Sequence, residues 1–156
     1  MSIAATTYQW YLAVHILAAV VWVGGALATQ VFALRAMRTN DGARIAAFSQ
    51  DAEWIGMRIF LPSSLILVVV GFLLVGEGDW DWSFWLVSAL AVWILSVIVG
   101  ATFLGPESGR IAKVIAREGA DSPAATARLK RIFLISRIEL VLLLLVVLDM
   151  TVKPGA

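Results

Sequence analysis

Four long apolar stretches occupy most of this 156-residue chain and constrain its fold more than any other feature. A helix needs about 20 predominantly apolar residues to cross the hydrocarbon core of a bilayer. Each stretch approaches or exceeds that length, and 61% of all residues are hydrophobic. The predicted spans are approximately residues 10–34, 59–76, 84–104 and 132–152. We therefore expect an all-α, four-helix transmembrane bundle with helical cytoplasmic extensions, formed by a single integral membrane domain over residues 1–156.

The composition excludes several classes of site and partner. The chain has no cysteine, which rules out disulfides, thiolate metal sites, thiol catalysis and covalent c-type haem attachment. The net charge is only +1, so electrostatics predict no nucleic-acid partner. The first ten residues contain no lysine or arginine, and the apolar stretch after them is too long for the core of a secretory signal. We expect this stretch to be retained as the first span, with the lipid bilayer as its partner.

Lysine and arginine are distributed unevenly among the connections. Two of the three connections are basic, whereas the short one at residues 77–83 carries only acidic charges. The basic residues are Arg35, Arg38, Arg44 and Arg58 in the first connection, and Arg110, Lys113, Arg117, Arg128, Lys130 and Arg131 in the third. Short loops rich in lysine and arginine stay in the cytoplasm. The pattern predicts a multi-pass protein of the bacterial cytoplasmic (inner) membrane with its N- and C-termini outside.

The first basic connection contains a second helical pattern. Thr39, Asn40 or Asp41 can cap a helix start. A stripe of apolar residues follows at spacings of three or four, formed by Ile45, Phe48, Ala52 and Ile55. We expect a helix that either lies at the membrane interface or runs straight into the second span, which Pro62 is expected to bend.

The other basic connection contains clearer start and stop signals. Gly105-Pro106 predicts an interruption at the end of the third span. Gly119 suits a helix C-terminus. Ser122-Pro123 combines a capping serine with a proline at the first helical position, so the last helix is predicted to start there.

The single histidine, His15, lies in the first span. Ionisable side chains inside spans are rare and mostly functional. Its helical face is mostly small and comprises Ala19, Trp22, Ala26, Thr29 and Ala33. Small residues allow close helix packing, and they also leave room for a flat cofactor. Two interpretations stay open: His15 forms a hydrogen bond to a neighbouring helix, or it is a haem or metal ligand.

The last span carries three further candidate residues. Glu139 and Arg58 are expected to form an ion pair with a structural role, with a proton relay as the alternative. Met150 is either a packing residue or a second axial haem ligand. Asp149 is a candidate for orienting His15. The roles of Met150 and Asp149 require spans one and four to be adjacent, as expected in a four-helix bundle.

Three tryptophans, Trp80, Trp82 and Trp85, cluster around the short acidic connection. Tryptophan is enriched at the headgroup level of membranes, where its ring anchors a helix end. We expect interfacial anchoring here, with stacking on a substrate or quinone as the alternative.

The spacing of His15, Trp22, Gly24 and Gly25 resembles the first helix of small bacterial membrane proteins related to the copper-resistance-protein-D domain. The nearest group is a family of four-span integral membrane proteins of unknown function, and the membrane protoporphyrinogen oxidases have a similar first helix. The resemblance implies association with a b-type haem or with copper through His15. The chain departs from those oxidases because it has one histidine and lacks their arginine-rich continuation. A bis-histidine site within one protomer is therefore excluded.

These observations predict a haem-binding integral membrane protein in redox chemistry or haem metabolism. The expected cofactor-binding residues are His15, Trp22, Gly25 and Met150, with His15 and Met150 as metal ligands. Haem b is the expected cofactor, and copper is the alternative. Two other functions stay open: a non-enzymatic accessory subunit of a membrane complex, or a small membrane transporter. A homo-oligomer or a larger membrane complex is expected, and no residue is assigned a catalytic role.

Overall fold

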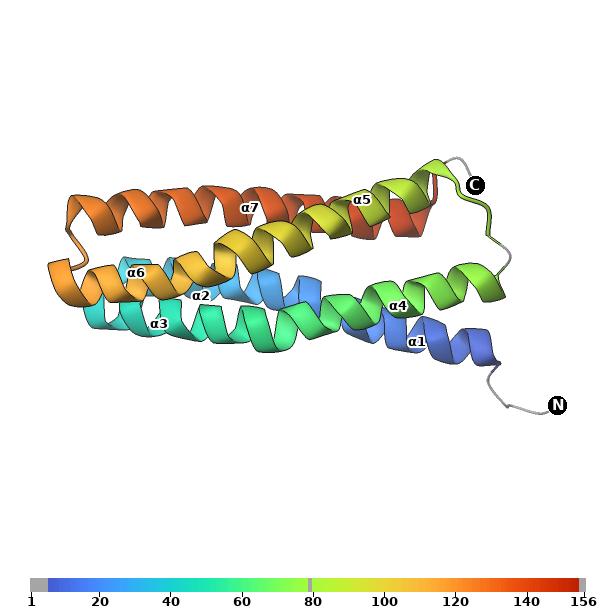
Figure 1. Cartoon of the computed structure of the whole chain (residues 1–156), viewed down its shortest axis with the longest axis horizontal. Helices are drawn as coiled ribbons and strands as arrows, with labels where there is room; N and C mark the ends of the chain where they lie inside the picture. Colours follow the sequence, from blue (N-terminus) through green and yellow to red (C-terminus); the bar gives the residue numbers. More distant parts are fainter. Residues whose placement is uncertain (1–5, 79, 155–156) are drawn as a thin grey trace.

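Four long helices run alternately up and down the molecule and are joined by short turns (Figure 1). The computed structural model describes residues 6–78 and 80–154. Three of the helices contain one wide π-helical turn each near mid-length. The first helix comprises α1 (Thr7–Ala19), the π-turn η1 (Val20–Gly24) and α2 (Gly25–Arg38). The remaining elements are α3 (Gly42–Ile55), η2 (Gly56–Phe60) and α4 (Leu61–Glu77); α5 (Phe84–Val99), η3 (Gly100–Leu104) and α6 (Gly105–Glu118); and α7 (Pro123–Val152).

Three of the four helices are long and apolar enough to cross a membrane. They are Thr7–Arg38, Gly42–Glu77 and Phe84–Glu118, with mean hydropathies of 2.0, 2.6 and 2.3 over their most apolar segments. The C-terminal helix α7 is 30 residues long, but its apolar part is interrupted by charged side chains, namely Arg137, Glu139 and Asp149. The all-α fold is thus confirmed, whereas four equally apolar spans are not. A transmembrane position for residues 132–152 stays a prediction.

The apolar helices present large hydrophobic side chains outward. Leu17, Val69, Ile98 and Leu148 are each more than half exposed. A soluble domain buries such side chains, but lipid solvates them at no cost. This outward apolar surface is what a lipid bilayer covers.

The helices also extend beyond the membrane. A 36-residue helix is roughly 54 Å long at 1.5 Å per residue, against about 30 Å for the hydrocarbon core. At one end α3, α6 and the start of α7 pack around a small apolar core, which contains Ile45, Ile111, Ile115, Ala125 and Leu129. Since α3 continues through η2 into α4, the first connection runs straight into the second helix. The expected helical extensions are therefore present.

A buried ion pair joins two of the helices of this extension, α6 and α7. Glu107 on α6 is only 5% exposed, and its carboxylate accepts a hydrogen bond from the Arg128 guanidinium on α7. Arg110, one turn further along α6, contacts the other carboxylate oxygen at 3.5 Å. The pair links α7 to α6, and the sequence patterns did not indicate it.

The helix ends follow their capping signals. Asp41 caps α3 by accepting from the backbone N–H of Ala43 at 2.9 Å. Gly119 ends α6 with a positive φ of 86°, a conformation that suits glycine. Ser122 caps α7 by accepting from the N–H of Ala125 at 3.2 Å. The predicted start of the last helix is confirmed.

The predicted interruption at Gly105-Pro106 is wrong, because the helix continues through both residues. A proline in a helix removes one N–H and presses on the carbonyl four residues earlier. For Pro106 that residue is Thr102, within η3, and for Pro62 it is Arg58, within η2. The widened π-turns accommodate the proline rings without ending the helices.

Both described ends of the chain lie at the same end of the bundle as the connection between α4 and α5 (Figure 1). The turns after α2 and α6 lie at the opposite end, as the alternation of basic and acidic connections predicts.

We expect single cysteines at Asp81 and Asp121 to label from opposite sides of sealed cells. Both positions are exposed, and the cysteine-free chain gives no background. Because the loops near Asp121 carry the basic residues, the Asp81→Cys variant should react with an impermeant maleimide on intact cells, and the Asp121→Cys variant only after permeabilisation. Labelling of both variants from one side would refute this topology.

Candidate functional site

His15 is held by the neighbouring helix α4. Its ring nitrogen Nδ1 lies 3.0 Å from the backbone carbonyl oxygen of Leu67. A carbonyl only accepts, so Nδ1 carries the proton and donates it, and Nε2 keeps a lone pair. Gly71, one turn further along α4, lies under the ring: a Cβ placed there would come within 3.3 Å of the His15 Cε1 atom. The packing of α1 on α4 therefore fixes both the tautomer and the plane of the imidazole.

The imidazole borders a cavity of about 620 Å³, called the outer cavity here because it lies in the half of the bundle nearer the termini. Helix α1 packs on α4, and α5 packs on α7; the cavity lies between these two pairs. Most of its wall consists of aliphatic and aromatic side chains, including Leu67, Leu90, Val146 and Val147. The cavity is large enough for an extended, flat apolar ligand.

The two candidate residues near the end of α7 have different positions. Met150 lines the outer cavity together with His15. Asp149 instead accepts a hydrogen bond from the Ser88 hydroxyl of α5, at 2.8 Å. The hypothesis that Asp149 orients His15 is therefore wrong. The reason is tertiary: the main neighbour of α1 is α4, so the backbone of Leu67 takes the position expected for a carboxylate of α7.

The outer end of the cavity is aromatic and carries one cation. Trp80 and Trp85 meet edge to face with ring centroids 5.7 Å apart, and the Lys153 ammonium lies 3.9 Å from the Trp80 centroid. Trp85 is only 5% exposed, and its indole N–H has no hydrogen-bond partner among the described residues. These three residues and Tyr8 line the cavity. The mouth thus offers a free donor, a phenol and an ammonium group.

Two of the three remaining residues of the first-helix motif line the outer cavity. Trp22 is 8% exposed and lines the outer cavity, as does Gly24. Gly25 has another role in the structure: a Cβ there would collide with the ring of Phe60, so the glycine lets η1 and η2 approach closely. Gly25 does not border the outer cavity within the described part of the chain.

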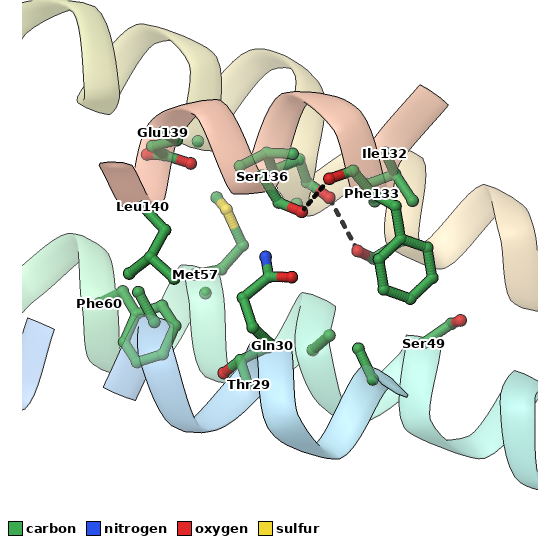
Figure 2. Close-up of a pocket in the computed structure, with 18 of the residues that line it drawn as sticks. Thr29, Gln30, Ser49, Met57, Phe60, Ile132, Phe133, Ser136, Glu139 and Leu140 are labelled. Atoms are coloured by element: carbon green, nitrogen blue, oxygen red, sulfur yellow. Dashed lines mark hydrogen bonds between the residues drawn. The ribbon is translucent and has the colours of Figure 1, made fainter. Parts of the chain in front are cut away.

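A second, smaller cavity of about 160 Å³ lies on the other side of Trp22, in the half of the bundle nearer the helical extension. Trp22 and Leu143 line both cavities and separate them. In this inner cavity Gln30 points from α2 across the space towards Ser136 of α7 (Figure 2). Glu139, one turn beyond Ser136, also lines it. The inner cavity therefore combines one carboxylate with several neutral polar groups.

The predicted ion pair between Arg58 and Glu139 is not formed in the described residues. The Arg58 guanidinium lies 5.9 Å from the ring centroid of Trp54, one turn away on its own helix. An arginine near a membrane surface reaches an aromatic ring and the headgroups more easily than the bundle interior. Glu139 instead faces the inner cavity. Gln30 and Ser96, which share that cavity, were missed; polar residues inside apolar stretches are the signal that could have identified them.

Residues 10–154 match a family described as "Predicted integral membrane protein (DUF2269)". The chain belongs to this family. The match covers all four long helices, so the uncharacterised membrane family expected from the first-helix motif is confirmed. No curated protein and no solved structure matches the chain.

The family description names no ligand or activity, so the chemistry of the site is argued from the residues of this chain. The described residues contain no group of three histidine, aspartate, glutamate or cysteine side chains that could hold a metal ion. A metal held through His15 therefore needs most of its ligands from elsewhere. In a haem, the porphyrin supplies four nitrogen ligands to the iron, so the protein needs to supply only one or two more.

Proposed function

We propose that this DUF2269 protein binds a b-type haem in the outer cavity, with His15 Nε2 as axial ligand, in redox chemistry or haem metabolism. The observation that carries the proposal is the imidazole itself: its Nδ1–H is donated to the Leu67 carbonyl, while its ring borders an apolar cavity of about 620 Å³. A ligating histidine usually donates its other N–H to a carbonyl or carboxylate, which fixes the tautomer and makes the ligating nitrogen more basic.

The other residues of the cavity fit the same group. Apolar walls suit the macrocycle, and Met150 supplies a thioether as a candidate second ligand. At the outer mouth, the unpaired indole N–H of Trp85, the Tyr8 phenol and the Lys153 ammonium suit the propionate carboxylates. Trp22 forms the floor and keeps the cavity separate from the inner, more polar one.

A bound haem would supply one-electron redox chemistry. The residues of the chain would orient the ligand and set the reduction potential. The carbonyl of Leu67 holds the imidazole proton at Nδ1, Gly71 packs against the ring, and aliphatic and aromatic side chains form most of the wall. An apolar, dry pocket and the axial ligand are the main controls on haem potential. Copper is the weaker alternative, because His15 and Met150 alone give two ligands, whereas copper sites usually have three or more.

The visible absorption spectrum of the purified protein tests the proposal. Protein from cells supplied with a haem precursor, in detergent or nanodiscs, is expected to show a Soret band at one haem per chain. If Met150 is the second ligand, Met150→Leu should change the spectrum of the reduced form and lower the midpoint potential, since a methionine ligand raises it. Met57→Leu, a methionine on the inner cavity, is the matched control and should change neither.

Protein that stays colourless after titration with haem would contradict the proposal. His15 would then only hold α1 against α4. That result would favour the alternative function, a non-enzymatic accessory subunit of a membrane complex. A band that Met150→Leu leaves unchanged would retain His15 as ligand and assign Met150 to packing.

A further inference from the structure

The inner cavity contains one acidic side chain without a partner of opposite charge. Glu139 is the only charged side chain among the described residues that line it, and its carboxylate has no salt bridge within residues 6–78 and 80–154. The nearby arginines face aromatic rings instead: Arg58 faces Trp54, Arg131 faces Phe103 and Arg137 faces Phe133. A carboxylate inside a membrane bundle needs a counter-charge or a proton.

Two further polar atoms in the cavity lack partners. The amide oxygen of Gln30 and the hydroxyl oxygen of Ser96 are buried and form no hydrogen bond in the described part of the chain. Ser96 is only 3% exposed, so bulk solvent does not satisfy it. Buried polar atoms without partners are rare in proteins, and an unseen ion or water is one standard explanation.

The remaining hydroxyls of the wall present oxygen lone pairs. Each donates its proton to a backbone carbonyl three or four residues earlier; these bonds join Thr29 to Gly25, Ser49 to Ile45, Ser64 to Leu61, Ser108 to Leu104 and Ser136 to Phe133. A hydroxyl whose proton is used in this way offers only lone pairs to a ligand. The wall is therefore rich in acceptors and complements a cation.

The three π-turns surround this cavity. The turn η2 contacts both η1 and η3, and residues of all three turns, including Trp22, Gly56 and Gly100, line the cavity. Single π-turns inside α-helices occur frequently at functional sites. The volume of about 160 Å³ has room for an ion together with several waters.

We infer that the inner cavity binds a small monovalent cation such as Na⁺, through the Glu139 carboxylate and the oxygens of Gln30 and Ser96. Small hard cations prefer oxygen ligands, and one carboxylate neutralises a single positive charge. The inference does not depend on haem, since Trp22 and Leu143 separate the two cavities.

Equilibrium binding of ²²Na⁺ to the full chain in nanodiscs tests this inference. We expect saturable binding of one ion per chain, and a higher melting temperature in sodium chloride than in choline chloride, because an ion that binds only the native state stabilises it. Glu139→Gln removes the charge at constant size and should weaken binding by roughly 10–100-fold. Ser96→Ala should weaken it by about 3–10-fold.

Asp149→Asn is the matched control. Asp149 lies on the same helix but bonds to Ser88 and lines neither cavity, so this variant should bind ²²Na⁺ like the wild type. Wild-type protein with no saturable binding would overturn the inference in favour of a protonated Glu139 surrounded by water. Unchanged binding in Glu139→Gln would also overturn it. If Glu139→Gln does not fold, the fold-change of Ser96→Ala decides.

Discussion

Replacing His15 with alanine is expected to abolish the Soret band of the haem-loaded protein. The imidazole is the only nitrogen ligand that the side chains of the described residues offer to the outer cavity, apart from the ammonium of Lys153 and the indole nitrogens, which are not iron ligands at neutral pH. The substitution removes the ligand but leaves α1 and α4 packed, because His15 is only half-buried. Absorption spectra and circular dichroism of the two proteins provide the measurement.

Adding free imidazole to the His15→Ala variant tests whether His15 is an iron ligand or only a packing residue. The space left by the ring in His15→Ala admits imidazole, which should restore a Soret band at millimolar concentration if His15 ligates iron. Gly71→Ala is a graded control: its new methyl group would lie 3.3 Å from Cε1 of the imidazole and should weaken haem binding without removing the ligand. A His15→Ala protein that retains the wild-type spectrum would show that the ligand is not His15.

Replacing Glu107 with glutamine is expected to lower the free energy of unfolding by about 1.5–3 kcal/mol, the usual range for hydrogen bonds to charged groups. The carboxylate is almost fully buried between α6 and α7 and binds both Arg128 and Arg110. Both arginines are partly exposed and can turn to water, so the loss should stay below that of a fully buried pair. Chemical denaturation in micelles, followed by tryptophan fluorescence, measures the difference.

An exposed ion pair in the same extension provides the comparison. Arg44 and Asp41 lie 3.9 Å apart with exposed fractions of 71% and 49%. Asp41→Asn removes the charge but keeps a good helix cap, so it should cost less than about 0.5 kcal/mol. Equal effects of Glu107→Gln and Asp41→Asn would mean that the buried pair adds no stability beyond a surface contact.

The sequence by itself determined the helices and their ends. Apolar stretches, together with the capping signals at Asp41, Gly119 and Ser122-Pro123, act within one or two helical turns and need no distant partner. The alternation of basic and acidic connections likewise predicted which ends of the helices lie together. These features could be predicted because their physical causes are local in the chain.

Predictions from local sequence signals were wrong where an unusual backbone turn or a distant side chain determined the structure. Gly105-Pro106 carries a stop signal, yet the π-turn η3 lets the helix continue. The polar residues of the last span could not be assigned partners from charge alone. Asp149 bonds to Ser88, and Glu139 faces the inner cavity rather than Arg58, because helix rotation as well as depth decides which side chains meet.

Only the tertiary structure decided what surrounds each candidate residue. The sequence marked His15, Trp22 and Met150 as candidates for one site, but their common cavity arises because α1 pairs with α4 and α5 with α7, which leaves space between the pairs. The carbonyl of Leu67 as the partner of His15, and the gathering of Gln30, Ser96 and Glu139 in a second cavity, have the same origin. Hydrophobic periodicity specifies that a helix has a packed face, whereas its partner and its rotation depend on side-chain packing summed over the whole bundle.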